Sequence, residues 1–204
     1  MKIAIIGAGN IGGSLGKVWA AHGHSVIFGV RDPNSEKTRK ALTETGATVQ
    51  AVDITEAAAF GEVIAIALPW AAVRETLAAM GDLSGKIIID ATNRFAAAPG
   101  DAPSAAEDIA RLAPGAKVFK AFNTMGWETL LDPIFSGQPA TAFVCGDDSA
   151  AKQVVIGLAA EIGLAPVDAG PLENAAAAEA VARLWVYLMR SGMGREMAFA
   201  LLKR

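Results

Sequence analysis

A glycine-rich segment near the start of the chain has the spacing of a phosphate-binding loop. Within IIGAGNIGG, Gly7, Gly9 and Gly12 form a G-x-G-x-x-G run between an apolar run and a helical pattern. Such glycines allow a tight turn, a close approach of backbone N–H groups to a pyrophosphate, and close packing of helix on strand. We therefore expect a dinucleotide here. The expected contacts are Gly7, Ala8, Gly9, Asn10, Ile11 and Gly12.

The segment VIFGVRDP indicates which dinucleotide to expect. An NAD site needs Asp or Glu at the end of the second strand, about 20 residues beyond the glycines, but Gly29 and Val30 occupy that place. Arg31 follows, and its planar, permanently charged guanidinium suits a phosphate, although it could also be a solvated loop residue. Asp32 stands beside Pro33, so we interpret it as a turn or a helix cap. The sequence favours NADP(H).

The side chains that donate protons in common dehydrogenases are missing. Ser191 stands four residues after the single tyrosine, Tyr187, where a short-chain dehydrogenase needs a lysine. His22 and His24 flank a glycine at the expected end of the first helix, and we interpret them as turn residues. With one cysteine, Cys145, no metal site is expected. Hydride exchange between a nicotinamide and a flavin-like ring mainly needs the rings held face to face, so we expect a planar acceptor.

The elements that would position these residues alternate between short apolar runs and longer helical patterns. This alternation is typical of βαβ units around a parallel sheet that is buried on both faces. The expected strands lie at residues 2–6, 25–29, 47–51, 62–67, 86–90, 117–121, 141–145 and 165–168. The expected helices lie at residues 10–22, 34–45, 70–80, 104–112, 149–162, 172–191 and 194–203. We expect glycines 23, 46 and 163 to end three of them.

The expected fold class is α/β, a doubly wound parallel Rossmann sheet with a small C-terminal extension. Residues 1–121 would form the dinucleotide-binding domain, and residues 122–204 would add a strand-helix-strand unit and terminal helices on the same sheet. The loop at 91–107, rich in Ala, Pro and Gly, is either the rim of an active site or a long surface connection.

Composition excludes some classes of partner. The chain has 18 Lys and Arg against 21 Asp and Glu, without the basic excess that nucleic-acid binding needs. No apolar run reaches the roughly 18 residues of a membrane span. Cys145 lies in the apolar run TAFVCG, which favours a small buried hydrophobe over a reactive thiol. We expect a cytoplasmic protein in a reducing compartment.

Several segments in this order resemble one known family. They are IGAGNIGGSLG, GVRDP, ALPW, KAFNTMGW, VCGDD and VDAGPLENA. The set resembles the deazaflavin-dependent NADP reductases, which exchange hydride between NADPH and a deazaflavin coenzyme. It is also similar to the cytosolic NADPH-binding domain of the six-transmembrane ferric reductases. The resemblance covers essentially the whole chain.

The resemblance implies roles for particular residues. It puts the pyrophosphate on Gly7 to Gly12 and the 2′-phosphate on Arg31, beside Val30, where the deazaflavin enzymes place a serine. The segment Leu68, Pro69 and Trp70 would pass beneath the cofactor, and Asn93 is a further candidate contact. Asn123, Thr124 and Met125 would border the nicotinamide and the second ring, which makes them the candidate catalytic residues. At Asn123 the deazaflavin enzymes tend to carry a histidine.

Three functional hypotheses follow. The first is an NADPH-dependent oxidoreductase that passes hydride to a deazaflavin, a flavin or a similar small-molecule acceptor. The second is an NADP-dependent reductase of a small carbonyl or imine, whose pocket the terminal helices would complete across a homodimer. The third is a non-catalytic NADP-binding sensor module. A homodimer is expected in any case.

Overall fold

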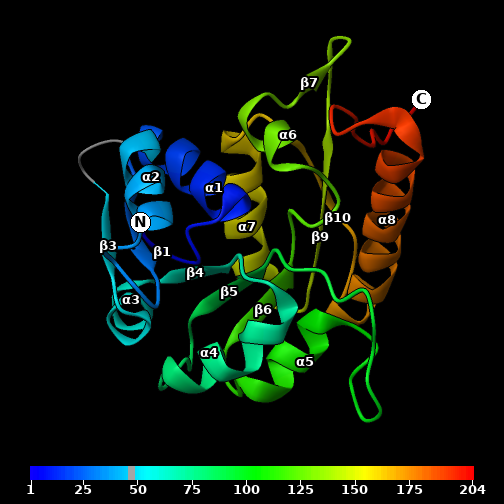
Figure 1. Ribbon diagram of the computed structural model, residues 1–204. Helices are drawn as coiled ribbons and strands as arrows, with labels where there is room; N and C mark the ends of the chain where they lie inside the picture. Colours follow the sequence, from blue (N-terminus) through cyan, green and yellow to red (C-terminus); the bar gives the residue numbers. More distant parts are fainter. Residues whose placement is uncertain (46–48) are drawn as a thin grey trace.

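The computed structural model describes residues 1–45 and 49–204 of the chain. In that part, eight strands form one sheet in the order β10-β9-β6-β5-β4-β1-β2-β3 (Figure 1). Its neighbouring strands are parallel, except that β9 pairs antiparallel with β6. The strands are β1 (Lys2–Ile6), β2 (Ser25–Gly29), β3 (Gln50–Val52), β4 (Val63–Ile66), β5 (Ile87–Asp90), β6 (Lys117–Lys120), β9 (Thr141–Gly146) and β10 (Ala165–Asp168). A short antiparallel hairpin joins β7 (Ile134–Phe135) to β8 (Gln138–Pro139). The expected α/β doubly wound class is confirmed.

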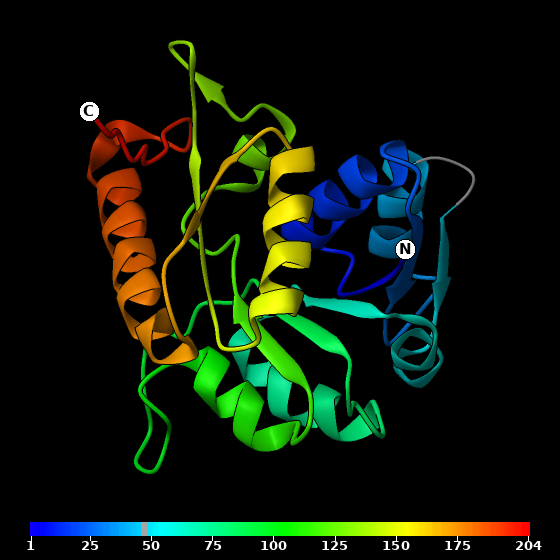
Figure 2. The same cartoon turned by 180° about the vertical axis from the view of Figure 1, so that it is seen from behind.

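Helices cover both faces of this sheet. One face carries α1 (Asn10–Ala21), α2 (Glu36–Thr45), α6 (Trp127–Leu131) and α7 (Ser149–Glu161). The other carries α3 (Ile54–Phe60), α4 (Val73–Ala79), α5 (Ala105–Leu112) and α8 (Ala175–Leu188). Short turns of helix lie at η1 (Trp70–Ala72), η2 (Leu172–Asn174) and η3 (Met189–Met193). Seen from behind, α7 crosses in front of the sheet, with α4 and α5 below it (Figure 2).

Alternating side chains of the central strand build the two halves of the core. Ile3 and Ile5 pack in the cluster that contains Leu15 of α1, whereas Ala4 and Ile6 pack in the cluster that contains the α3 and α4 side chains. This two-residue alternation is what a strand buried on both faces requires. The core fixes β1, and therefore the loop that follows it, in a single orientation.

Two smaller expectations are confirmed. Cys145 is fully buried, and desolvation raises the pKa of its thiol to about 11, so it behaves as a small hydrophobe. Gly23 and Gly163 follow α1 and α7 with positive φ angles of 85° and 89°, which end these helices. The expected strand at 47–51 corresponds to β3, three residues later at its start, while residues 46–48, including the expected helix end at Gly46, lie outside the described residues.

The expected helix at 194–203 is wrong. Gly192 and Gly194 have φ angles of 105° and 75°, a left-handed backbone that ends the helical path. The chain then runs beside β9, where the Thr141 N–H donates to the Phe199 carbonyl at 2.8 Å and the Leu201 N–H donates to Thr141 Oγ1 at 2.8 Å. Hydrogen bonds to the first residue of β9 therefore take the place of the helix.

The sequence reading also missed α3, α6 and the β7–β8 hairpin. The start of α3 could have been predicted from the sequence. Asp53 caps this helix by accepting the Glu56 N–H at 2.8 Å, and an acidic residue three positions after a capping residue is a known pattern of helix starts. No helix among residues 1–45 and 49–204 is long and apolar enough to cross a membrane.

Candidate active site

Close backbone contacts leave no room for a side chain at two of the three glycines in the loop after β1. Gly7 has a φ of 107°, and a Cβ there would lie 2.6 Å from the Ala67 carbonyl oxygen. A Cβ on Gly12 would overlap the Gly7 carbonyl oxygen. At Gly9, by contrast, a Cβ would meet only the side chain of Lys37, with Nζ 3.6 Å away. The loop therefore presents bare backbone at the start of α1, which fits a pyrophosphate.

The end of β2 cannot carry the acidic side chain of an NAD site. A Cβ on Gly29 would lie 2.7 Å from both Ala57 Cβ and Ile6 Cδ1. Val30 is buried, and its N–H donates to the Val52 carbonyl at 3.1 Å. Because packing occupies both positions, the first residue that can reach a ribose or phosphate here is the exposed Arg31.

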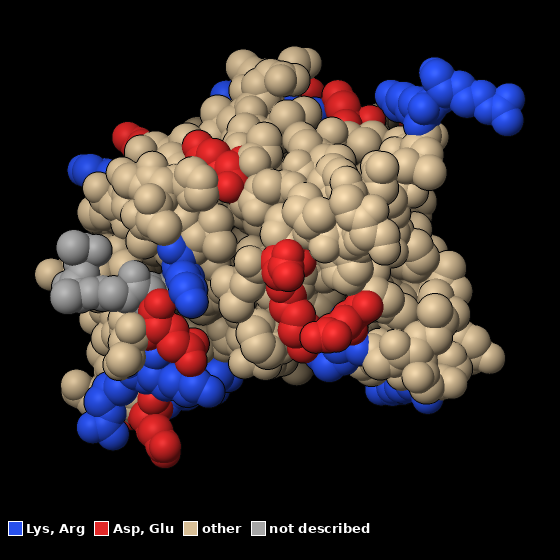
Figure 3. Space-filling model, turned by 90° about the horizontal axis from the view of Figure 1, so that it is seen from above, with Lys and Arg blue, Asp and Glu red and all other residues tan. Residues whose placement is uncertain are grey.

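A hollow of about 540 Å³ lies beside Arg31 and the glycine loop. Its lining includes Gly7, Ala8, Gly9, Val30, Arg31, Leu68 and Pro69, all expected from the sequence. Asp32 forms a turn, since its Oδ1 accepts the Asn34 N–H at 2.9 Å, and Ser35 caps α2 instead. Lys and Arg side chains gather on the side of the molecule that carries α2 (Figure 3).

Lys37 also lines this hollow, and the sequence reading missed it. It stands in the first turn of α2, six residues after Arg31. Neither cation forms an ion pair with any described residue. Two unpaired cations beside bare glycine backbone are suited to the phosphates of a dinucleotide. The sequence could have indicated Lys37, because a lysine in the first turn of the helix that follows Arg31 lies close to the same phosphates.

A second cavity of about 510 Å³ adjoins the first, and the two share Gly9, Lys37, Ala67, Leu68 and Pro69. The expected site residues that line it are Gly9, Asn10, Ile11, Leu68, Pro69, Trp70, Asn93, Asn123 and Met125. Thr124 is buried and does not line it, and Gly12 packs against Gly7 instead. The loop at 91–107 forms part of its rim through Thr92, Asn93 and Phe95.

Aromatic side chains form the walls of this second cavity. They are Trp70, Phe95, Phe122, Trp127 and Trp185. Aromatic faces at several sides suit a flat ring system. None of the described residues that line the cavity is Tyr, His, Cys, Asp or Glu, and its one lysine, Lys37, stands beside the glycine loop.

Trp185 and Arg195 complete the wall from the C-terminal part, and sequence reasoning gave them no site role. The Trp185 indole N–H donates to the Met197 carbonyl at 3.0 Å, and the Arg195 guanidinium lies 5.5 Å from the indole ring. Arg195 Nε donates to Glu128 Oε1 at 2.6 Å. Burial is the largest single influence on the pKa of Glu128 and raises it. The hydrogen bond from Arg195, a backbone hydrogen bond and the positive charge of Arg195 together hold this pKa below its usual value.

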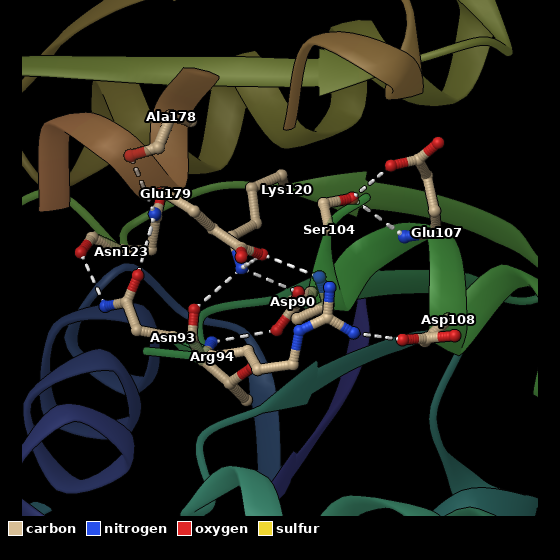
Figure 4. A network of polar contacts seen from close by, with 12 residues as sticks. Asp90, Asn93, Arg94, Ser104, Glu107, Asp108, Lys120, Asn123, Ala178 and Glu179 are labelled. Carbon is tan, nitrogen blue, oxygen red and sulfur yellow. Dashed lines mark hydrogen bonds and ion pairs between the residues drawn. The ribbon is translucent and has the colours of Figure 1, made fainter. Parts of the chain in front are cut away.

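Thr92, Asn93 and Asn123, which we call the polar floor, connect this cavity to a buried network (Figure 4). Asn93 Nδ2 donates to the Asn123 carbonyl at 2.9 Å, and Asn123 Nδ2 donates to Asn93 Oδ1 at 3.1 Å. Asn123 Nδ2 also donates to the Ala178 carbonyl of α8 at 3.3 Å. The floor therefore joins the ends of β5 and β6 to α8.

Two polar atoms of the floor have no partner. Among the described residues, Thr92 Oγ1, Asn123 Oδ1 and Thr129 Oγ1 are the buried side-chain oxygens or nitrogens without a hydrogen bond. Two of these three belong to residues that line the cavity. An unpaired buried polar atom costs about 1–3 kcal/mol, so the polar floor is held in place against an energetic cost.

Buried Arg94 supports the aromatic wall from behind. Its guanidinium pairs with Asp108 and donates to the Ala102 carbonyl, and it lies 5.5 Å from the centre of the Trp70 ring. Side-chain exposure of Arg94 is only 3%, so the ion pair is almost dry. The orientation of Trp70 is therefore fixed by a rigid neighbour.

A parallel sheet with a glycine loop after β1 and a cavity at the carboxyl ends of its strands defines a dinucleotide-dependent class of α/β protein. The family model "NADP oxidoreductase coenzyme F420-dependent" matches residues 2–94. The chain belongs to this family, and it is an NADP(H)-dependent oxidoreductase. The resemblance stated from the sequence is confirmed.

Similar proteins cover most of the chain. It is 29% identical to the F420-dependent NADP reductase of Methanocaldococcus jannaschii, over 92% of each chain. A crystal structure of a candidate F420-dependent NADP reductase from Arthrobacter sp. FB24 is 30% identical, with a TM-score of 0.89 and full coverage of both chains. The metalloreductase STEAP3 of Rattus norvegicus is 32% identical over 88% of this chain, which spans 36% of that protein.

A more distant solved structure bears on the alternative hypothesis. The reductive aminase of Aspergillus terreus, in complex with NADPH4, cyclohexanone and allyl amine, is 26% identical with a TM-score of 0.71. The match covers 94% of this chain and 62% of that one. The shared fold therefore spans about three fifths of that enzyme.

Proposed function

We propose that the protein transfers a hydride between NADP(H) and a planar ring acceptor such as a deazaflavin or a flavin. The observation that carries this proposal is the aromatic cavity beside the glycine loop, whose described lining includes no Tyr, His, Cys, Asp or Glu. In the forward direction, NADPH and a proton would reduce the acceptor by two electrons and leave NADP⁺. The proton can come from solvent, so the protein mainly has to hold two rings face to face.

In this proposal the hollow beside Arg31 binds the phosphates, and the second cavity binds the nicotinamide and the acceptor ring. Arg31 and Lys37 would hold the phosphates, with the backbone of Gly7 to Gly12 at the pyrophosphate. Asn123 and Met125 would border the nicotinamide, and Thr124 would act through its packing behind them. Trp70 would flank the ring pair, with Leu68 and Pro69 beneath the cofactor and Asn93 on the polar floor.

Anaerobic oxidation of NADPH tests the proposal. The reaction would be followed at 340 nm with riboflavin, FMN, FAD and a deazaflavin as separate acceptors. Turnover with at least one of them is the expected result, whereas binding of NADPH without turnover of any would favour the sensor hypothesis.

Reduction of a small imine or carbonyl is the second candidate, because the chain shares its fold with the Aspergillus terreus reductive aminase. Turnover of a cyclic imine at a higher kcat/KM than that of every flavin and deazaflavin would replace the leading proposal. That candidate also needs a partner chain to close the cavity. We propose a homodimer and a cytoplasmic location, and light scattering after gel filtration measures the first.

A further inference from the structure

Beneath the polar floor lies a buried cluster of three charged side chains, Lys120, Asp90 and Glu179, which we call the charged triad (Figure 4). Lys120 Nζ donates to Asp90 Oδ2 at 2.8 Å and to Glu179 Oε1 at 2.9 Å. Side-chain exposures are 0% for Lys120 and Asp90 and 4% for Glu179. The triad joins the ends of two neighbouring strands to α8.

The charges of the triad do not cancel. One ammonium faces two carboxylates, so the cluster holds one negative charge in excess. Each carboxylate also accepts a backbone N–H: Asp90 Oδ1 from Thr92 at 2.8 Å, and Glu179 Oε1 from Ala105, the first residue of α5, at 2.8 Å. Backbone donors and a helix amino end stabilise carboxylate charge.

A buried charged cluster that joins a helix to a sheet carries a large desolvation penalty. Burying charges costs several kcal/mol per ion, and apolar residues of similar volume often stabilise a fold as well or better. Stability alone therefore gives a weak account of these three residues. Their position suggests another role.

The triad lies directly behind the floor of the cavity. Lys120 Nζ donates to the Thr92 carbonyl at 2.7 Å, and Glu179 follows Ala178, whose carbonyl accepts from Asn123. Thr92 and Asn123 both line the cavity. A charge in the triad thus acts on the cavity through one layer of residues, with almost no water between.

Other charges around the cavity do not offset this excess. Of its described lining residues, only Lys37 and Arg195 are charged. Lys37 stands beside the glycine loop, and Arg195 is paired with Glu128. The buried Arg94 is already matched by Asp108, with Asp101 at 3.3 Å as a further acid.

We propose that the charged triad sets the redox preference of the cofactor site by stabilising the cationic, oxidised nicotinamide over the neutral, reduced one. This inference rests on the proposed function, because it needs the nicotinamide to lie over the polar floor. Hydride loss converts a neutral ring into a cation, and a fixed negative charge behind the floor favours the product of that step. Lys120, Asp90 and Glu179 are thus positioning residues that act through the floor.

Dissociation constants of NADP⁺ and NADPH on the wild type and on Glu179→Gln test the proposal. The substitution keeps an oxygen for Lys120 and Ala105 but removes the excess charge. We expect NADP⁺ to bind roughly tenfold more weakly relative to NADPH, the order of magnitude for one unit charge about 10 Å away at an effective dielectric constant of about 20. A structural role alone would weaken both forms alike.

Asp90→Asn removes the same charge from β5 rather than from α8, and it should shift the ratio in the same direction even if Glu179→Gln fails to fold. Asp168→Asn is the matched control, because it breaks the Lys152 ion pair on β10, which does not line the cavity. An unchanged NADP⁺ to NADPH ratio in both triad variants overturns the inference. If the wild type binds neither form, the proposed function fails instead.

Discussion

Gly12 of α1 rests against the carbonyl oxygen of Gly7, so closely that a Cβ on Gly12 would overlap that oxygen. The oxygen belongs to the rigid turn at the end of β1 and cannot move aside. We therefore expect Gly12→Ala to lower the free energy of unfolding by about 2–4 kcal/mol, through strain at the turn. Urea unfolding followed by circular dichroism measures this change.

The neighbouring glycine supplies a matched control. A Cβ on Gly13 would lie 3.9 Å from Ala41 Cβ, an ordinary contact, so Gly13→Ala should be neutral or stabilise the helix by about 0.5–1 kcal/mol. Equal destabilisation by both substitutions would show that the Gly7 contact is not what limits position 12.

Arg31 should discriminate between the two dinucleotides. Arg31→Ala is expected to raise the Kd of NADPH roughly tenfold to a hundredfold and to leave that of NADH almost unchanged, because only NADPH carries the 2′-phosphate. Titration calorimetry with both cofactors measures this. Arg39→Ala, on the same side of the molecule but outside the hollow, should change neither value. Equal losses for NADPH and NADH would contradict the assignment of Arg31.

Lys37 should affect both dinucleotides. Because its Nζ lies 3.6 Å from the Cβ position of Gly9, we expect Lys37→Met to weaken NADPH and NADH alike, by about fivefold to tenfold. Arg39→Met, on the same helix but outside the hollows beside the glycine loop, is the control and should have little effect. A loss confined to NADPH would instead place Lys37 at the 2′-phosphate.

Trp127 should act on the acceptor rather than on the cofactor. Its ring lines the second cavity but not the hollow beside Arg31. Trp127→Ala is expected to raise the KM for a flavin or deazaflavin about tenfold while the Kd of NADPH stays within about twofold. Tyr187→Ala, an exposed aromatic of α8 outside the cavity, should leave both constants unchanged. A parallel loss of NADPH binding would mean that Trp127 supports the fold instead.

The sequence predicted those parts of the site that are formed by residues close together in the chain. The glycine spacing and the position of Arg31 after an uncharged strand end could be read directly, because they reflect backbone needs within one βαβ unit. The alternation of apolar runs likewise predicted the eight strands of the main sheet and most of the helices between them.

The rest depends on contacts between distant segments. Nothing near Glu179 in the sequence indicates that it meets Lys120, 59 residues away, or that Trp185 closes the aromatic wall. The antiparallel pairing of β9 with β6 brings these parts together, and a strand pattern does not specify its own direction. The helix expected at 194–203 failed for a related reason, since the edge of β9 offered this segment backbone partners.

The hydrogen bonds from Trp185 to Met197 and from Thr141 to Phe199 have a consequence for synthesis on the ribosome. The glycine loop, Arg31 and Lys37 all lie between residues 7 and 37, whereas the aromatic wall needs Trp185, 148 positions after Lys37. A nascent chain therefore carries the phosphate contacts long before it can enclose an acceptor ring. The place for the electron recipient is completed only after the place for the phosphates.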